Sequence, residues 1–453
     1  MKHLNELFKY IDQNANRFIE DLKILCKQPS VSAQKRGINE CVNLLEKIME
    51  DIGIKVRIFK VKNGNPIVFG ELKSGSSKES LGFYNHYDVQ PPDPLDEWKF
   101  PPFNPVIKDG KFYARGASDN KGDLISRLEA VRAFLEVYGD VPVNLKFLIE
   151  GEEESGSPHL PDFVRENTNL LRAEGYLWEG EGVDIEGRPI VTLGAKGIIH
   201  VEFRARGPKI DVHSSRAPLV PNPAWRLVWM LSMLKGNDEK IKIPGWYDNV
   251  VPPDEEDIRL LEEAPFDEEA DKRELGLKEY LLGVTGTESL KTLLFSPTCN
   301  ISGFYSGYTG PGTKTVLPSE AFVRVDFRLV VDQKPDLLFR KLKNYLKENR
   351  FEDITVIKHS AYEAAKTPAS DPFVTRVVKT AKRIYSLRPV IWPTSAGTGP
   401  LYVIRKWLGI PVVSAGGPGY PGSRIHAPNE NIRLKDYIKS IKYMVAIIST
   451  YEE

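Results

Sequence analysis

The sequence predicts an α/β fold with two domains, and three observations lead to this class. Segments with helical spacing of apolar residues alternate with short apolar runs that are typical of strands. A chain of 453 residues is too long for one hydrophobic core. The hydrophobic pattern also changes near residue 197 and again near residue 365. We therefore expect one domain of residues 1–196 and 366–453, with a central mixed sheet flanked by helices, and a smaller inserted α+β domain of residues 197–365.

The first domain is expected to alternate helices with strands. Apolar residues at helical spacing predict helices over 4–26, 39–51, 123–138 and 371–386. Short apolar runs predict strands over 55–60, 66–71, 81–85 and 143–150. In open α/β sheets the functional side chains gather where the strands end, so the residues after these strands are the first candidates for a site.

The inserted domain is expected to form a separate small sheet covered by helices. Period-two alternation and apolar runs predict strands over 198–204, 321–330 and 354–358. Helical spacing predicts helices over 222–234 and 335–349. The acidic stretch 253–274 is interpreted as the solvated face of a helix.

Composition argues against several classes of function. Lys+Arg and Asp+Glu both number 62, so there is no global positive field that would favour nucleic acid or an anionic membrane as a partner. The sequence has no run of 18 apolar residues, so no membrane helix is predicted. The N-terminus lacks the apolar centre of a signal peptide. The three cysteines have no Cys-x-x-Cys spacing, which suits a reducing compartment and argues against a thiolate zinc site. We expect a cytoplasmic enzyme or binding protein.

His86 and Asp88 are candidate functional residues at the end of a predicted strand. Pro91 and Pro92 stop that strand, and a carboxylate two residues after a histidine can fix the orientation of a metal-bound ring. The alternative for this short pattern is a structural histidine that is hydrogen-bonded to a neighbouring backbone group.

Other acids and one late histidine extend the candidate site. They are Asp119, residues 152–154, Glu179, Glu181 and His426. Imidazole and carboxylate ligands suit divalent metals. The three adjacent glutamates of 152–154 are unfavourable in a cleft unless cations or a shared proton relieve them. One of them can bind a metal while a neighbour serves as a general base; a solvated acidic loop is the alternative.

Four ordered motifs resemble the metal motifs of one enzyme family. They are His86-Tyr87-Asp88-Val89-Gln90-Pro91, Arg115-Gly116-Ala117-Ser118-Asp119-Asn120-Lys121-Gly122, Glu153-Glu154-Ser155-Gly156-Ser157 and His426-Ala427-Pro428-Asn429-Glu430. The chain resembles the dinuclear zinc peptidases and deacylases, which include carnosinase-type dipeptidases, glutamate carboxypeptidase, aminoacylase, acetylornithine deacetylase and succinyl-diaminopimelate desuccinylase. The separations of 33 residues from His86 to Asp119 and 34 residues from Asp119 to Glu153 resemble the carnosinase branch.

The resemblance implies two metal ions that share one carboxylate. Asp119 is implied as the bridging ligand. His86 and Glu179 would complete one metal site, and Glu154 and His426 would complete the other. The implied metal is Zn²⁺, with Co²⁺ and Mn²⁺ as alternatives that the same ligand types accept.

The resemblance also implies the residues that act beside the metals. Asp88 would orient His86, and Glu153 would be the general base. Glu179 is preferred to Glu181 as the ligand because it directly follows an apolar run, although both remain candidates. The dipeptidase branch has Asp at this position, whereas the carboxypeptidase and aminoacylase branches have Glu. The resemblance further implies a cis peptide bond directly after Asp119.

The inserted domain is implied to complete the site as a lid that also forms the dimer. His213 matches a histidine that crosses the dimer interface and hydrogen-bonds the oxyanion. Thr315 and Arg328 match residues that hold a substrate carboxylate, for which the fork of an arginine is suited. Thr398 lies in a Gly-rich segment that resembles a substrate loop. From the residues alone, the alternatives are that His213 is an exposed loop histidine and that Arg328 is a surface arginine without a functional role.

We therefore expect a two-metal hydrolase that releases an amino acid from small peptides with a free carboxylate, as a carboxypeptidase or a dipeptidase. The alternative is a deacylase of N-acyl amino acids, and a non-catalytic relative that binds metal or peptide is a further one. We expect a homodimer, and neither nucleic acid nor a membrane as a partner.

Overall fold

The structure is a computed structural model that describes residues 2–452. The chain divides into two compact units. The first consists of Met1–Gly194, Lys366–Thr394 and Val403–Glu453, and the second consists of Ala195–Ala365 and Ser395–Tyr402. The segment Ser395–Tyr402, which the sequence assigns to the first domain, groups with the second unit because its strand pairs there.

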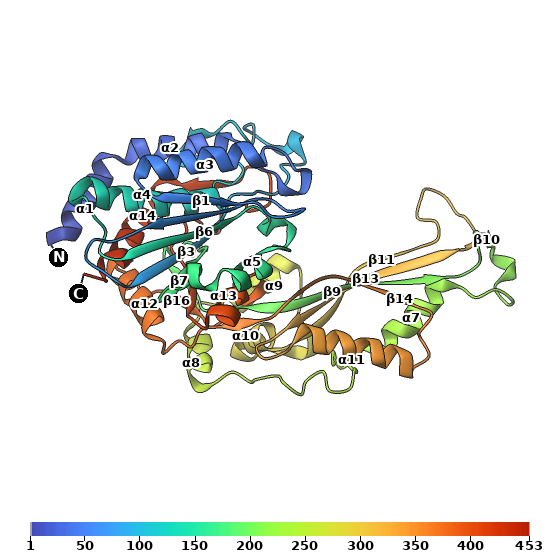
Figure 1. The fold of residues 1–453 in the computed structure, drawn as a ribbon. Helices are drawn as coiled ribbons and strands as arrows, with labels where there is room; N and C mark the ends of the chain where they lie inside the picture. Colours follow the sequence, from blue (N-terminus) through green and yellow to red (C-terminus); the bar gives the residue numbers. More distant parts are fainter. Residues whose placement is uncertain (1, 453) are drawn as a thin grey trace. The chain divides into compact units, whose positions relative to one another are not determined.

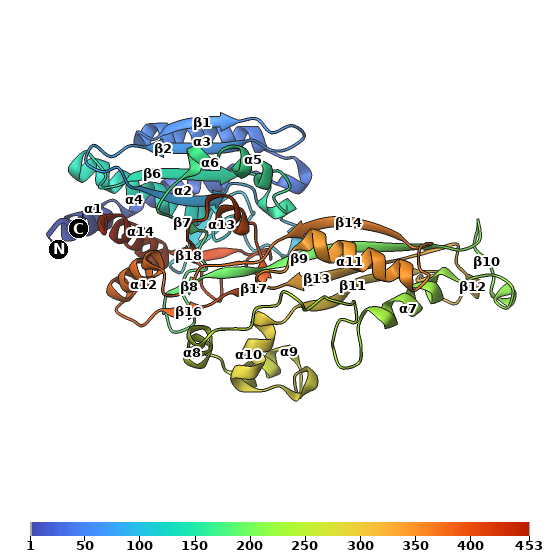
Figure 2. The ribbon, with the colours of Figure 1, turned by 60° about the horizontal axis from the view of Figure 1, so that its bottom comes forward.

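An eight-stranded mixed sheet lies at the centre of the first unit (Figures 1 and 2). Its order is β1 (Lys55–Phe59), β2 (Ile67–Leu72), β6 (Asn144–Glu150), β3 (Ser80–His86), β7 (Gly175–Trp178), β18 (Val412–Ala415), β8 (Ile190–Thr192) and β16 (Val390–Trp392). The middle strands β6, β3, β7 and β18 are parallel neighbours. Because the carboxyl ends of parallel strands meet at the same edge, the loops that follow these strands gather at one place.

The strands predicted for this unit are confirmed as β1, β2, β3 and β6. A small antiparallel sheet adds β4 (Val106–Lys108), β5 (Lys111–Tyr113) and β19 (Asn431–Arg433). Asn431 in β19 lies opposite Tyr113 in β5. This pairing brings the late part of the chain beside the segment that precedes Asp119.

Helices cover the central sheet (Figures 1 and 2). They are α1 (Lys2–Gln13), α2 (Ala15–Lys27), α3 (Ile38–Ile52), α4 (Lys121–Tyr138), α5 (Leu160–Glu166), α6 (Thr168–Leu171), α12 (Pro372–Tyr385), α13 (Tyr402–Leu408) and α14 (Leu434–Ser449). The helices predicted over 39–51, 123–138 and 371–386 are confirmed as α3, α4 and α12. Helix α4 packs against β3, α2, α3 and α14, so it lies in the interior of the unit.

The single helix predicted over 4–26 is wrong, because the structure has two helices that break at Asn14. The backbone of Asn14 leaves the helical region, with φ −107° and ψ 11°. Its side-chain amide donates a hydrogen bond to the carbonyl of Tyr10 at 2.9 Å. Asparagine competes for backbone hydrogen bonds in this way, which is why it favours helix ends over helix interiors.

The second unit is built on a six-stranded sheet. Its strands are β11 (Thr298–Ser306), β13 (Glu320–Leu329), β9 (Gly194–Arg206) and β14 (Thr355–Tyr362), with β15 (Ala365–Lys366) and β17 (Ser395–Thr398) also paired to β9. The predicted strands are confirmed as β9, β13 and β14, whereas β11 was not predicted. Apolar side chains of β9 and β13 alternate onto one face, where they form a core with α7 (Pro223–Leu234) and α11 (Pro335–Glu348).

Two further groups of elements belong to the second unit. The acidic stretch 253–274 forms α8 (Glu255–Glu263) and α9 (Glu268–Leu275), as the interpretation of a helical face requires, and α10 (Gly286–Phe295) follows. A two-stranded sheet pairs β10 (Val212–His213) with β12 (Val316–Leu317). Within residues 2–452, none of the helices combines the length and the apolar character that crossing a bilayer demands.

Candidate metal centre

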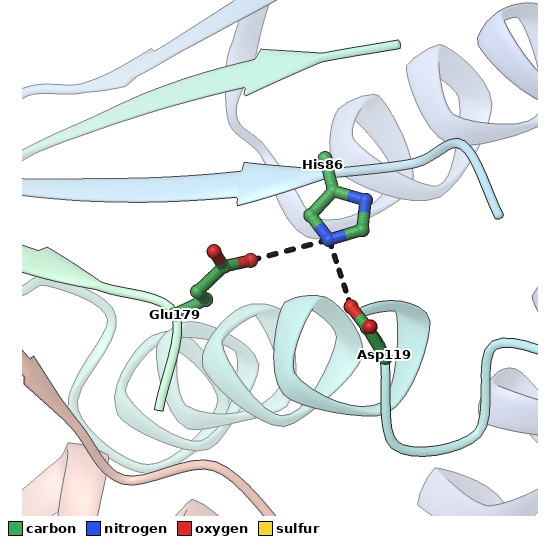
Figure 3. Close-up of side chains that lie close together, drawn as sticks. All are labelled: His86, Asp119 and Glu179. Atoms are coloured by element: carbon green, nitrogen blue, oxygen red, sulfur yellow. Dashed lines mark hydrogen bonds and ion pairs between the residues drawn. The ribbon is translucent and has the colours of Figure 1, made fainter. Parts of the chain in front are cut away.

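His86 is the last residue of β3 and is fully buried. Its Nε2 atom lies 2.9 Å from Oδ1 of Asp119 and 3.2 Å from Oε2 of Glu179 (Figure 3). Glu179 directly follows β7, the parallel neighbour of β3, and Asp119 precedes α4. The three side chains therefore meet because they follow, or lie beside, the carboxyl ends of adjacent strands.

A second group lies on the other oxygen of Asp119. The Oδ2 atom of Asp119 lies 2.9 Å from Nε2 of His426, and Oε2 of Glu154 lies 3.1 Å from the same nitrogen. Glu154 follows β6, and His426 lies in the loop after β18. Asp119 thus faces one group with each of its two carboxylate oxygens.

These two groups fit a pair of divalent cations. Each offers one imidazole nitrogen and two carboxylate oxygens, and the ligand atoms of each group lie within 4.8 Å of one another. Apart from its contact with Nε2 of His86, the buried Oε2 atom of Glu179 has no polar partner among the described residues, which is costly for a carboxylate unless a cation satisfies it. Nitrogen and oxygen ligands of this kind suit zinc and similar divalent metals.

Asp88 contacts both His86 and the turn that carries the glutamates. The Nδ1 atom of His86 donates to the main-chain carbonyl of Asp88 at 3.0 Å, and the carboxylate of Asp88 is farther from it, at 3.4 Å. That carboxylate accepts hydrogen bonds from the main-chain N–H groups of Glu153 and Glu154 at 3.2 and 3.1 Å. Nδ1 therefore carries a proton, and Nε2, on the side of Asp119, is the ring atom that can bind a metal.

The charges of the site favour bound positive charge. Burial lowers the pKa of His86, but hydrogen bonds to the carboxylates of Asp119 and Asp88 outweigh it and hold that pKa well above its usual value. Asp119 and Glu154 raise the pKa of His426 to about 10. Burial, together with the charge of Glu179, raises the pKa of Glu153 well above its usual value. The crowded carboxylates thus stabilise bound cations, and they favour a proton on Glu153, which lies outside the ligand groups.

Glu181, the other candidate ligand of the sequence, lies outside the cluster. Its carboxylate accepts a hydrogen bond from the hydroxyl of Thr192 at 3.1 Å. We expect Glu179→Gln to lower the metal content to about one ion per chain, since an amide is a weak metal ligand, whereas Glu181→Gln keeps the wild-type content. Metal analysis of the two purified variants checks this; equal losses in both would contradict the assignment.

Glu430 is the last residue of the motif that begins at His426, and the sequence predicts no role for it. Its fully buried carboxylate accepts hydrogen bonds from Nη1 of Arg115 at 2.8 Å and from the main-chain N–H groups of Gly116, Ser118 and Asp119 at 2.9, 2.8 and 3.0 Å. Charge-assisted bonds of this kind are strong. Glu430 therefore fixes the loop that presents Asp119, and it does so from the segment that also carries His426.

Arg127 on α4 was not predicted either. It lies in the interior, where it forms an ion pair with Asp123 at 3.0 Å. Its guanidinium donates to the carbonyls of Tyr84 at 2.6 Å and Leu177 at 3.1 Å. These carbonyls lie near the ends of β3 and β7, two residues before His86 and Glu179 respectively. The signal in the sequence is the spacing of Asp123 and Arg127, an acid and a base four residues apart on one helix.

Two glycines let the loops after β7 and β18 lie against each other. A Cβ atom on Gly180 or on Gly417 would overlap the main chain of the other residue. This close approach places the loop that begins at Glu179 beside the loop that leads to His426. No other residue type fits such a contact.

The remaining candidates lie in the second unit, where they form two pairs. Nη1 of Arg328 on β13 donates to the hydroxyl of Thr398 on β17 at 2.6 Å. His213 is exposed at the end of β10, and the N–H of the next residue, Ser214, donates to the carbonyl of Thr315 at 3.2 Å. The structure thus brings Arg328 together with Thr398, and it places Thr315 next to the residue that follows His213.

The ligand groups of the first unit define a class of protein, a dinuclear metal-dependent hydrolase. The Asp119–Asn120 peptide bond is cis, as the resemblance implies. Residues 82–450 match the peptidase family M20/M25/M40, and the chain belongs to this family. It is a metal-dependent peptide hydrolase, so the predicted family, fold class and type of enzyme are confirmed.

Similar proteins include dipeptidases and a carboxypeptidase. The Beta-Ala-His dipeptidase of Rattus norvegicus is 30% identical over 376 residues, which cover 78% of this chain and 76% of the relative. The Cys-Gly metallodipeptidase of Candida albicans is 27% identical over 482 residues, which cover 99% of this chain and 97% of the relative. The crystal structure of an M20 family metallo-carboxypeptidase from Sulfolobus solfataricus has a TM-score of 0.91 and 41% identity, and the match covers 96% of this chain and 99% of that one.

Proposed function

We propose that this chain releases the C-terminal amino acid from dipeptides and other short peptides with a free carboxylate. The observation that carries the proposal is the pair of ligand groups that share Asp119, with Glu153 directly beside them. The relatives named as dipeptidases and as a metallo-carboxypeptidase support this class of substrate. The guanidinium of Arg328 in the second unit, which also donates to Thr398, supplies donors that suit a peptide carboxylate.

The proposed cofactors are two Zn²⁺ ions, with Co²⁺ and Mn²⁺ as alternatives. Asp119 would be shared, His86 and Glu179 would complete one site, and Glu154 and His426 would complete the other. When bound, such ions polarise the scissile carbonyl and lower the pKa of water. The imidazole and carboxylate ligands, without any thiolate, are consistent with all three metals.

Glu153 is proposed as the general base. Its main-chain N–H is held by the carboxylate of Asp88, and its side chain is outside both ligand groups. A carboxylate whose pKa is raised is a stronger base than an ordinary one, so it is suited to take a proton from the attacking water and to return it to the leaving amine. Asp88 is the proposed positioning residue, because it contacts the ring of His86 and the turn of Glu153.

His213 is proposed to donate a hydrogen bond to the oxyanion of a site in a partner subunit. The N–H of Ser215 donates to Nδ1 of His213 at 3.2 Å, so the neutral ring carries its proton on Nε2. The ring is exposed in this chain, and its Nε2 atom is therefore available to a second copy. Thr315, adjacent to this position, is proposed to contact substrate.

The proposed homodimer forms through the second unit. On α7 the side chains of Trp225, Val228 and Trp229 are exposed, the two tryptophans by 57% and 54%, and the two indole rings stack with centroids 6.1 Å apart. Large aromatic side chains are enriched in protein interfaces and are seldom left in water together. This aromatic face of α7 is the surface that we propose for contact with the second copy.

Replacing both tryptophans, Trp225→Glu and Trp229→Glu, is expected to convert the dimer to monomers and to lower kcat, since His213 would no longer be supplied in trans. Light scattering during gel filtration measures the mass, and metal analysis shows that the first unit is intact. Leu95→Glu is a matched control, because Leu95 is similarly exposed but lies in the first unit. A double variant that remains a dimer would exclude this surface.

We infer that the protein works in the cytoplasm. Cys26, Cys41 and Cys299 are all free and buried, and burial raises the pKa of Cys26 and of Cys299 to about 12. Protonated, buried thiols are typical of proteins in a reducing compartment.

The substrate is tested by hydrolysis of three matched compounds with metal-reconstituted protein: a free dipeptide, an N-blocked dipeptide and an N-acetyl amino acid. Cleavage of the free dipeptide alone would define a dipeptidase, and cleavage of the N-blocked dipeptide would define a carboxypeptidase. Preference for the N-acetyl amino acid would support the deacylase, the alternative to which Glu179 points by its resemblance to the aminoacylase branch. Failure to cleave any of them with Zn²⁺, Co²⁺ or Mn²⁺ would contradict the proposal and favour a binding protein.

A further inference from the structure

Lys196 is a buried lysine at the start of β9, in the second unit, and the proposed reaction leaves it without a role. Only 2% of the residue is exposed. Its ammonium group donates to the carbonyls of Leu293 and Ser296 at 2.5 and 2.7 Å, at the C-terminal end of α10. No carboxylate of the described residues lies within 4.0 Å of it. A buried charge without a counter-ion is unfavourable, so it calls for an explanation.

Lys196 and Arg328 lie on the same face of the sheet. Arg328 is opposite Ile198 in the pairing of β13 with β9, and side chains two residues apart on a strand point to the same side. Lys196 is therefore a diagonal neighbour of Arg328, at a typical Cα separation of about 7–8 Å. Strand β17 lies beside β9 (Figure 2), and Thr398 is opposite Lys196 in this pairing. The hydroxyl of Thr398 accepts a hydrogen bond from Arg328.

The two cations are poorly neutralised by the protein. The nearest carboxylate to Arg328 is that of Asp326, with Oδ1 3.9 Å from Nε, and Asp326 also accepts a hydrogen bond from Asn300 at 2.9 Å. Burial, and then the charge of Arg328, lower the pKa of Lys196 to about 8. Like charges at this separation repel in a partly buried site, and an anion between them relieves the repulsion.

We propose that Lys196 is the second cation of the carboxylate subsite that Arg328 and Thr398 form. In this arrangement Arg328 and Thr398 contact the substrate carboxylate. Lys196 lies behind them, fixed by the carbonyls of α10, and strengthens binding through its charge. It is a positioning residue that makes the subsite selective for a free carboxylate. The inference rests on the proposed function.

A purely structural role must be separated from this one. The ammonium also caps the end of α10, where a positive charge is favourable for any helix. Loss of that contact would displace α10 and weaken the binding of all substrates alike. Loss of the charge alone would weaken the binding only of substrates that carry a carboxylate. The two roles therefore differ in how a free dipeptide compares with its C-terminal amide.

The test compares Lys196→Gln and Lys196→Arg with the wild type on a dipeptide and on the corresponding C-terminal amide. Glutamine keeps a hydrogen-bond donor for the α10 carbonyls without the charge, and arginine keeps the charge. We expect Lys196→Gln to raise KM for the free acid roughly tenfold with little change in kcat, and to leave the amide unaffected. Lys196→Arg is expected to retain most of the preference for the free acid. Thermal unfolding of each variant shows that the fold is kept.

Equal losses on acid and amide in Lys196→Gln would overturn the proposal and assign Lys196 to the anchoring of α10. Unchanged selectivity in Lys196→Gln would also overturn it. A wild type that cleaves acid and amide equally well would instead contradict the proposed recognition of a carboxylate, and this inference with it. Should Lys196→Gln not fold, Lys196→Met supplies a second uncharged variant for the same comparison.

Discussion

Replacing Glu153 by Gln is expected to lower kcat about 10³-fold, the range in which a positioned general base contributes. The amide cannot accept the proton of the attacking water, whereas the ligand groups around Asp119 are unchanged. Both metals should therefore remain bound, and KM should change little. Steady-state kinetics and metal analysis of the same preparation measure the two effects together.

The neighbouring glutamate provides a matched control for this experiment. Glu152 belongs to the same run of three acids, but its carboxylate lies 2.7 Å from Nδ1 of His159, outside both ligand groups. Glu152→Gln is expected to keep most of the activity. Near-wild-type turnover in Glu153→Gln would remove that residue from the reaction, and loss of metal in this variant would make it a ligand instead of a base.

Replacing Asp119 by Asn should have the largest effect on metal content. Asp119 faces His86 with one oxygen and His426 with the other, so one substitution weakens both sites. We expect less than one ion per chain and a loss of activity of at least about 10³-fold, since the proposed reaction uses both ions. Titration of the metal-free protein with Zn²⁺, followed by calorimetry, measures the affinities directly.

Glu154→Gln is the informative comparison for the bridging role. Of the two ligand groups, Glu154 belongs to that of His426, so its loss should spare the site at His86 and leave about one tightly bound ion. Asp96→Asn, at an exposed position, should leave both affinities unchanged. If Asp119→Asn retains two tightly bound ions, Asp119 does not bridge them.

Much of the site could be predicted because its residues follow strands. His86 and Glu179 come directly after apolar runs, and parallel strands bring such residues to one edge without any need to know the distant contacts. The choice of Glu179 over Glu181 rested on this position alone, and the structure places Glu179, and not Glu181, in the ligand group. Ligand identity and strand ends are local properties, which a sequence displays.

Residues that act through the main chain of distant segments could not be predicted. Glu430 and Arg127 form hydrogen bonds with backbone groups, which no pattern of side chains in the sequence predicts. Asp88 contacts His86 through its carbonyl at a shorter distance than through its carboxylate. The strand β11 was missed for another reason. Most of its side chains are exposed, so it lacks the alternation by which a half-buried strand is recognised.

The assignment of the segment Ser395–Tyr402 to a unit could not be predicted from the sequence either. It is separated from the rest of the second unit by almost thirty residues that belong to the first. Its strand β17 joins β9 in parallel, with Ser395 opposite Ala195. Pairing between segments this far apart leaves no trace in composition or periodicity. Thr398 could therefore be named through the family resemblance, but not through its place in the fold.

The bonds of Glu430 to the loop of Asp119 span 311 residues of sequence, and the whole of the second unit is translated between the two segments. A ribosome adds residues in order, so a nascent chain acquires His86, Asp119 and Glu179 long before His426 and Glu430 emerge. Until then one ligand group lacks the imidazole of His426, and the loop of Asp119 lacks its hydrogen bonds to Glu430. The two ligand groups are therefore complete only after residues 426–430 have been translated, and a chain released before that point carries Glu153, the proposed base, without them.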